Sequence, residues 1–94
     1  MKKDEDHYLE VARQAKNQSD WGKAIYYYSL SAELNPPNLA SVLIDRGFAY
    51  FQLKRYRHAK TDYEAAKRLL ETRSYDSNDS RQQVVVTARL IYLY

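Results

Sequence analysis

The sequence predicts an all-α fold in which two antiparallel helical hairpins are followed by one C-terminal helix. The pattern of apolar and small residues around Trp21 and Ala24 recurs 35 residues later around Tyr56 and Ala59. Repetition at this period is typical of stacked helix pairs. Small residues at matching positions allow the two helices of a hairpin to approach within about 8 to 10 Å. No alternation of apolar and polar residues persists for more than a few positions, so strands are not expected.

The first repeat is expected at about residues 5–38. Apolar residues recur at three- and four-residue steps over residues 4–18, which predicts an amphipathic helix. Asp20 can cap the second helix through its side-chain oxygen. Pro36 and Pro37 are expected to end that helix, because proline cannot donate the backbone hydrogen bond that would continue it.

The second repeat is expected at about residues 40–73. Asn38 can cap its first helix, and apolar residues between Val42 and Leu53 continue the helical spacing. The second helix of this repeat is expected from about residue 56 to residue 72.

The remaining residues predict a linker and a final helix within the same domain, which spans residues 1–94. Residues 73–79 are polar and rich in turn-forming types. Ser80 and Gln83 then make a capping-box pair, which predicts a C-terminal helix over about residues 80–93. Three consecutive valines lower the helix propensity of this segment, and an edge strand is the alternative.

Composition excludes several classes of protein. With 45% hydrophobic residues and ten tyrosines, the chain is too apolar for a disordered segment, and no apolar run is long enough to span a membrane. Cysteine is absent, which excludes disulfides, thiol catalysis and cysteine-based zinc sites. The net charge of +3 is weak support for an acidic partner. No apolar stretch follows the two N-terminal lysines, so a secretory signal is not expected and a cytoplasmic location is.

The residues that recur in the two predicted repeats resemble the tetratricopeptide repeat, whose pattern is W-x2-L-G-x2-Y, then A-x3-F, then P. The chain departs from the pattern at Arg46, where the pattern has leucine, and at Glu71, where it has proline. The first repeat matches through Tyr8, Val11, Ala12, Ala15, Ala24, Tyr28 and Pro36, and the second through Leu43, Gly47, Tyr50, Ala59 and Tyr63.

The resemblance implies a protein-interaction adaptor or assembly module that binds a peptide or a partner helix and has no catalytic residues or cofactors. In this family the first helix of each repeat lines a concave groove. Carried over position by position, the groove would consist of Leu9, Arg13, Lys16 and Asn17 from the first repeat, and Ile44, Asp45, Phe48, Phe51 and Gln52 from the second.

Two features of this groove have alternative interpretations. Phe48 is not required at a packing position of the pattern, so it can anchor a partner or pack against the C-terminal helix. Arg13 and Lys16 can hold a carboxylate or a phosphate through charge-assisted hydrogen bonds, or they can be ordinary solvated charges.

Some members of the family bind the acidic tails of heat-shock chaperones through a carboxylate clamp of lysine, asparagine and arginine side chains. Asp45 would repel the terminal carboxylate of such a tail. Binding of a chaperone tail without a standard clamp is therefore a minor alternative. The matching positions are Leu9, Arg13, Asp45, Gln82 and Val86.

No arrangement of residues indicates an enzyme or a metal site. His7 with Glu10, and His58 with Asp62, have helical spacings that could share a metal, but each pair offers two ligands and a zinc site needs three or four. Surface ion pairing is the expected role of both pairs. The chain also lacks a glycine-rich phosphate loop and a recognisable nucleophile arrangement.

A basic module that binds RNA or another polyanion is the competing hypothesis. Tyr56 and Tyr63 occupy packing positions and are expected to be buried, and acidic residues dilute the positive charge, so nucleic acid is not the partner that we expect. The basic residues that crowd into the second hairpin are Lys54, Arg55, Arg57, His58, Lys60, Lys67 and Arg68.

The C-terminal helix carries more apolar residues than one stripe of a short exposed helix needs. Some are expected to cover the second hairpin, and the rest to form the interface of a homodimer. No membrane partner is expected. The residues expected at the interface are Val85, Ile91, Tyr92, Leu93 and Tyr94.

Overall fold

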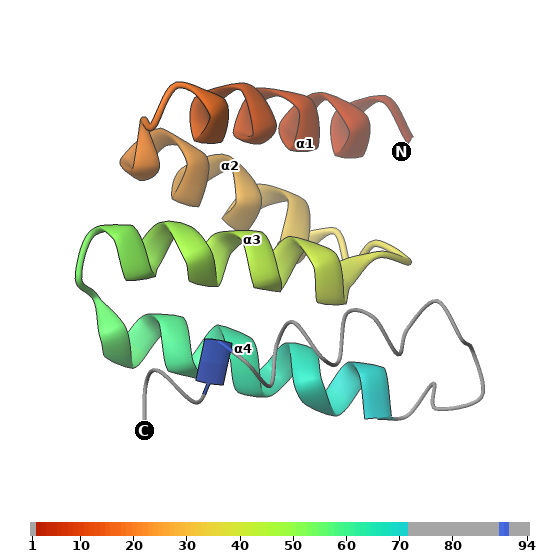
Figure 1. Cartoon of the computed structure of the whole chain (residues 1–94). Coiled ribbons are helices and arrows are strands. Elements are labelled where there is room, and N and C mark those ends of the chain that lie inside the picture. The colour runs from red at the N-terminus through yellow and green to blue at the C-terminus, as the bar shows by residue number, and fades with distance from the viewer. Residues whose placement is uncertain (1, 72–88, 91–94) are drawn as a thin grey trace.

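The computed structural model describes residues 2–71 and 89–90, which form helices and the turns that join them. The helices stack in chain order, each antiparallel to the next, so that each packs mainly against its neighbours in sequence (Figure 1). None of the described residues forms a strand, and the prediction of an all-α fold is confirmed. The helices are α1 (Lys2–Asn17), α2 (Trp21–Glu33), α3 (Leu39–Gln52) and α4 (Tyr56–Glu71).

Part of the C-terminal prediction lies outside the described residues. This holds for the linker at 73–79, for the Ser80 and Gln83 capping pair and for the choice between helix and strand at the valines. Arg89 and Leu90 are described and are helical. Within residues 2–71 and 89–90, no helix has both the length and the apolarity that crossing a lipid bilayer requires.

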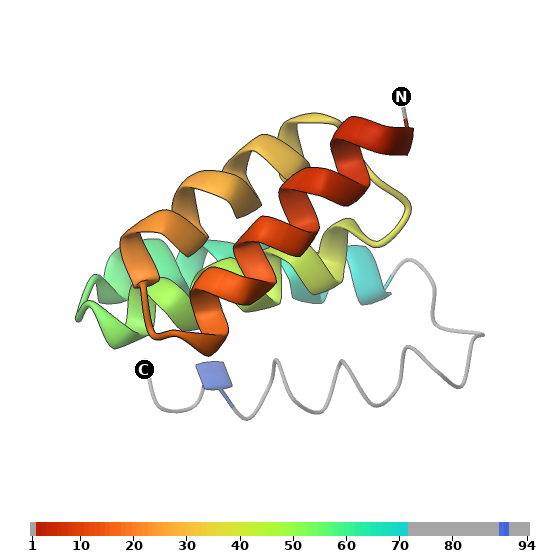
Figure 2. The ribbon, with the colours of Figure 1, turned by 90° about the horizontal axis from the view of Figure 1, so that it is seen from above.

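The 35-residue repeat extends to the backbone of the turns that follow α1 and α3. Ser19 and Lys54, which are 35 residues apart, both have a φ of 61°, the left-handed conformation that commonly closes a helix. The amides of the next residues, Asp20 and Arg55, donate to the carbonyls five positions earlier at 2.8 and 2.9 Å. The two hairpins therefore turn in the same way, and the first crosses over the second at an angle (Figure 2).

The helix caps agree with the sequence at one position and differ at another. The Asp20 carboxylate accepts a hydrogen bond from the amide of Lys23 at 3.4 Å and so caps α2, as predicted. Asn38 precedes α3, but its side chain makes no capping hydrogen bond, so that prediction is wrong. A backbone turn supports this end instead, in which the Leu39 amide donates to the Pro36 carbonyl at 3.1 Å.

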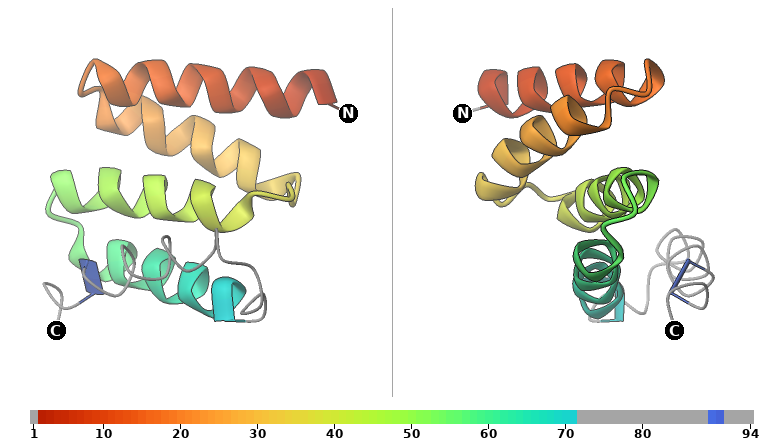
Figure 3. Two further views of the ribbon diagram at one scale, coloured as in Figure 1. Left: turned by 45° about the vertical axis from the view of Figure 1, so that its right-hand side comes forward. Right: turned by 90° about the vertical axis from the view of Figure 1, so that its left-hand side faces the viewer.

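Two hydrophobic clusters form the core, and α3 contributes to both. The first cluster joins α1, α2 and α3, and the second joins α3 and α4 with Leu90. Leu90 is 3% exposed and packs in the cluster of these two helices, so the C-terminal region covers the second hairpin at this residue. Figure 3 shows the short described segment 89–90 in blue, next to α4. The first cluster consists of Ala12, Ala15, Ala24, Tyr28, Val42 and Ala49, and the second of Ala40, Leu43, Ile44, Ala59, Tyr63, Ala66, Leu70 and Leu90.

Small residues occupy the closest helix contacts, as the sequence predicts. Ala12, Ala24 and Ala59 are fully buried. A Cβ atom at Gly47 would lie 2.7 Å from Cε1 of Tyr63, so α3 and α4 can approach only where this side chain is absent. Tyr63 is buried as expected and fills the space beside Gly47.

Tyr56 does not match its counterpart Trp21. The prediction that Tyr56 is buried is wrong, because its side chain is 47% exposed. Trp21 packs edge-on against Phe48 of the next hairpin, with ring centroids 5.6 Å apart, whereas no further hairpin covers Tyr56 within the described ranges. Tyr56 instead contacts Phe51, with centroids 5.3 Å apart.

We predict that Gly47→Ala destabilises the fold by about 1 to 3 kcal/mol, because the added methyl group must displace the buried Tyr63 ring. The matched control is Gly22→Ala in α2, where a Cβ meets nothing within 4 Å. This control is expected to gain about 0.5 to 1 kcal/mol from helix propensity. Urea denaturation followed by circular dichroism measures both, and equal stability of the Gly47 variant and wild type would contradict the close contact.

Candidate functional site

Polar side chains from α1 and α3 that are exposed or partly exposed lie next to one another and form a candidate binding surface. Lys16 in α1 and Asp45 in α3 make an ion pair, with Nζ and Oδ1 3.4 Å apart and side chains 35% and 30% exposed. Arg13 and Asn17 are exposed on α1. We call these four residues and Phe48 the α1–α3 surface. Because the ion pair is partly solvated, it contributes at most about 1 kcal/mol to stability and can exchange for a partner's charge.

Phe48 is surrounded by side chains from three parts of the chain. Trp21 packs edge-on against it, the Lys16 ammonium lies 5.9 Å from the centre of its ring, and the Arg89 guanidinium carbon lies 4.8 Å from that centre. Cations at these distances are attracted to the face of an aromatic ring. Of the two interpretations of Phe48, packing against the C-terminal region is therefore observed, and the ring remains partly exposed.

The structure separates the other predicted groove residues. Ile44 is 8% exposed and belongs to the core cluster of α3 and α4, so its inclusion in the groove is wrong. Successive residues of a helix point in different directions around its axis, so Ile44 packs toward α4 while Asp45 reaches α1. Leu9 is half-buried against the first core cluster. Phe51 contacts Tyr56 at the end of α3, and Gln52 is exposed beside it.

Tyr28 lies beneath the α1–α3 surface. Its side chain is fully buried, and its hydroxyl has no hydrogen-bond partner among the described residues. Burial raises the pKa of Tyr28, the negative charge of Asp45 raises it further, and the positive charge of Arg13 opposes the shift. The phenol therefore stays neutral in the folded protein at any pH near neutrality.

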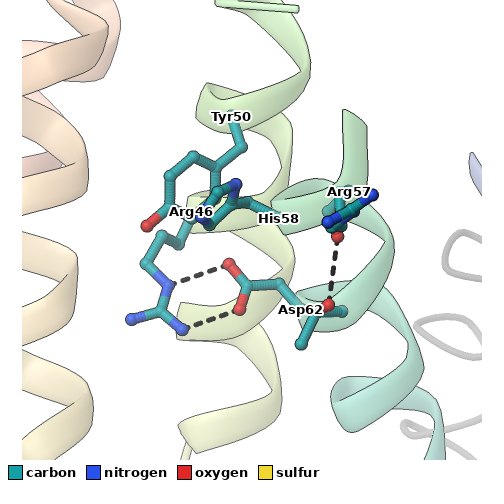
Figure 4. Close-up of a pocket in the computed structure, with 6 residues that line it drawn as sticks. Arg46, Tyr50, Arg57, His58 and Asp62 are labelled. Carbon is teal, nitrogen blue, oxygen red and sulfur yellow. Dashed lines mark hydrogen bonds and ion pairs between the residues drawn. The ribbon is translucent and has the colours of Figure 1, made fainter. Parts of the chain in front are cut away.

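A second polar site joins α3 to α4. Arg46 donates to both carboxylate oxygens of Asp62, from Nε at 2.8 Å and from Nη2 at 2.7 Å (Figure 4). Its Nη1 donates to the Ser29 hydroxyl in α2 at 3.2 Å. We call these three residues the Arg46 network. The Asp62 side chain is 5% exposed, so the acidic partner of this ion pair is buried.

A shallow pocket of about 220 Å³ lies over the Arg46 network. The centroid of the Tyr50 ring lies 5.9 Å from the Arg46 guanidinium carbon and 5.0 Å from the centroid of the His58 ring. Hydrogen bonds to Asp62 raise the pKa of Arg46. The Arg46 guanidinium and the Asp62 carboxylate satisfy one another's hydrogen bonds, so this arrangement supports packing rather than acid–base chemistry. The pocket is lined by Arg46, Tyr50, Arg57, His58, Thr61 and Asp62.

The role predicted for Asp62 from the sequence is wrong. The sequence spacing predicts a surface ion pair between His58 and Asp62, but Asp62 is buried and bonded to Arg46 instead. His7 and Glu10 are both exposed. Over the described ranges, no group of three or more potential ligand side chains could hold a metal ion. The available sequence signal was Arg46 itself, a charge at a position where the repeat pattern has leucine.

Comparison of the chain with protein-family models, curated proteins and solved structures found no significant match. The residues expected at a homodimer interface, Val85 and 91–94, lie outside the described residues. The geometry of the α1–α3 surface and of the Arg46 network is therefore the basis for a functional proposal.

We predict that Arg46→Leu destabilises the protein by about 3 kcal/mol, because it leaves the Asp62 carboxylate buried and unpaired. The double variant Arg46→Leu with Asp62→Leu is expected to recover to within about 1 kcal/mol of wild type, since an apolar pair of similar volume has no charge to desolvate. Urea denaturation of wild type, both single variants and the double variant gives the coupling energy. Additive losses would show that the two side chains are independent.

We also predict that the protein loses stability as the pH rises above about 10, the pKa of an unperturbed tyrosine. Burial raises the pKa of Tyr28 and of Tyr63 in the folded state, so the unfolded state releases protons first and is favoured as the pH rises. Tyr28→Phe should lose less stability than wild type between pH 8 and pH 11. Thermal melts across that range measure the difference, with Tyr26→Phe, which alters a 60% exposed side chain, as the control.

Proposed function

We propose that the chain is a tetratricopeptide-like adaptor or assembly module that binds a peptide or a partner helix on the α1–α3 surface. The family assignment is supported by the repeated turns at Ser19 and Lys54 and by the close contact at Gly47. The observation that carries the binding proposal is the ion pair of Lys16 with Asp45 beside Phe48, because it brings exchangeable charges next to a partly exposed aromatic ring.

The charges of this surface favour a partner with acidic side chains. Lys16 and Arg89 place two cations over the Phe48 ring, and Arg13 adds a third, exposed cation on α1. Asp45 is the acid of this surface. A partner carboxylate that replaces Asp45 at Lys16 would form a charge-assisted hydrogen bond. A free terminal carboxylate would instead meet Asp45 directly, which disfavours a clamp for chaperone tails.

The proposed role needs no catalytic residue, cofactor or metal. It is compatible with the expected cytoplasmic location. Self-association through the C-terminal helix is a separate proposal, because the residues expected at that interface are not part of the α1–α3 surface.

We predict that Arg13→Ala and Lys16→Ala each weaken binding of a protein partner by roughly tenfold, the cost of a central interface contact. The partner would be isolated from cell lysate with the wild-type chain as bait and then titrated by calorimetry. Lys23→Ala, which removes an exposed charge from α2, is the matched control and should bind like wild type.

A melting temperature near that of wild type would confirm that each variant is folded. Phe48→Ala is also expected to weaken binding, but its loss of contacts with Trp21 and Arg89 makes the Arg13 variant the cleaner test. Unchanged affinity of both the Arg13 and the Lys16 variants would exclude the α1–α3 surface as the binding site.

A further inference from the structure

The turn between α3 and α4 carries a cluster of exposed cations on a fixed backbone. The amides of Lys54 and Arg55 each donate to a carbonyl of α3 at 2.9 Å. Every side chain from Leu53 to His58 is exposed. The cations are therefore carried by a turn of defined backbone, which is the green connection from α3 to α4 at the left of Figure 1. We call Leu53, Lys54, Arg55, Tyr56, Arg57 and His58 the basic turn.

The fold itself does not require this charge. The turn between α1 and α2 has the same backbone, but it carries Asp20 where the basic turn carries Arg55. Asp20 caps α2, whereas an arginine side chain has no acceptor with which to cap α4. Arg55 and Arg57 also lie at the start of α4, where positive charge opposes the helix dipole. The charge of the basic turn thus points to a role outside the fold.

The two acids that form ion pairs near this turn and on the neighbouring face do not pair with its cations. Asp45 pairs with Lys16 and Asp62 pairs with Arg46, and neither bond involves Lys54, Arg55 or Arg57. The acid that follows them in the chain, Asp62, is 5% exposed in its side chain and bonded to Arg46. Their charge is therefore available to an external polyanion, and phosphate backbones bind such clusters by releasing counterions.

Tyr56 adds an aromatic surface in the middle of the cluster. Its side chain is 47% exposed, and its ring is supported edge-on by Phe51 at 5.3 Å. A supported ring with an open face can stack on a nucleobase without selecting its sequence. The expectation that Tyr56 is buried counted against nucleic-acid binding, and the structure removes that objection.

We infer that the basic turn binds single-stranded nucleic acid, with Lys54, Arg55 and Arg57 on the phosphates and Tyr56 stacked on a base. A lipid surface fits less well, because a membrane-binding helix needs a broad apolar face and the basic turn exposes only Leu53 and Tyr56 as large apolar groups. The site is separate from the α1–α3 surface, so either proposal can fail without the other.

The first test is fluorescence anisotropy with a labelled single-stranded oligouridylate and the full chain. With about three phosphates contacted, the logarithm of the binding constant should fall with the logarithm of salt concentration at a slope of roughly −2. Arg55→Gln with Arg57→Gln should reduce that slope to roughly −0.7 and weaken binding at low salt by at least about tenfold. Tyr56→Ala should weaken binding by roughly tenfold, and Tyr56→Phe should not.

The matched control is Lys23→Gln with Arg68→Gln, which removes the same charge from two exposed sites outside the basic turn. It should bind within about twofold of wild type. Absence of wild-type binding, equal loss in this control, or an unchanged affinity of Tyr56→Ala would each overturn the inference. Binding to vesicles of phosphatidylserine but not to the oligouridylate would also overturn it, in favour of a membrane surface.

Arg55→Asp separates binding from folding, because it copies the capping residue of the first turn. Its melting temperature should rise by roughly 4 °C if the new cap contributes as caps usually do, while its affinity for the oligouridylate should fall by at least about tenfold. A variant that is destabilised and weakened together would show that Arg55 serves the fold, and would overturn its assignment to the phosphates.

Discussion

The buried carboxylate of Asp62 must be paired, and the arrangement of three helices depends on how it is paired. Arg46 meets this requirement with two hydrogen bonds to Asp62, and it donates a third hydrogen bond from Nη1 to Ser29. Desolvating a lone carboxylate costs several kcal/mol, so any arrangement that separates Arg46 from Asp62 is strongly disfavoured. The two residues thereby hold α3 against α4, and Ser29 ties the first hairpin to the second.

The same pairing determines the charge of the surface nearby. Because Asp62 is bonded to Arg46, it neutralises neither His58 nor the cations of the basic turn. On the α1–α3 surface the opposite holds, since Asp45 remains partly exposed and pairs with Lys16. The protein therefore presents one surface of mixed charge, which we propose binds a protein partner, and one cationic surface, which we propose binds a polyanion.

The two hairpins have the same backbone and differ in what they expose. Ser19 and Lys54 share a left-handed conformation, and the amides after them make equivalent hydrogen bonds. The following residues, Asp20 and Arg55, have opposite charge. A turn closed by backbone hydrogen bonds does not depend on its side chains, which leaves those side chains free to differ in function. The difference between the hairpins is thus one of surface chemistry.

The sequence by itself determined the helices, the all-α fold and the small residues at the helix contacts, since spacing along one chain reports which face of a helix is apolar. The resemblance to the repeat pattern placed Lys16, Asp45 and Phe48 on one surface, and in the structure Lys16 contacts both of the others. Only the tertiary structure decided that Arg46 pairs with Asp62, that Ile44 is buried and that Tyr56 is exposed. Contacts between helices depend on the angle at which the helices cross and on whether another hairpin packs on top. The spacing of residues within a single helix specifies neither.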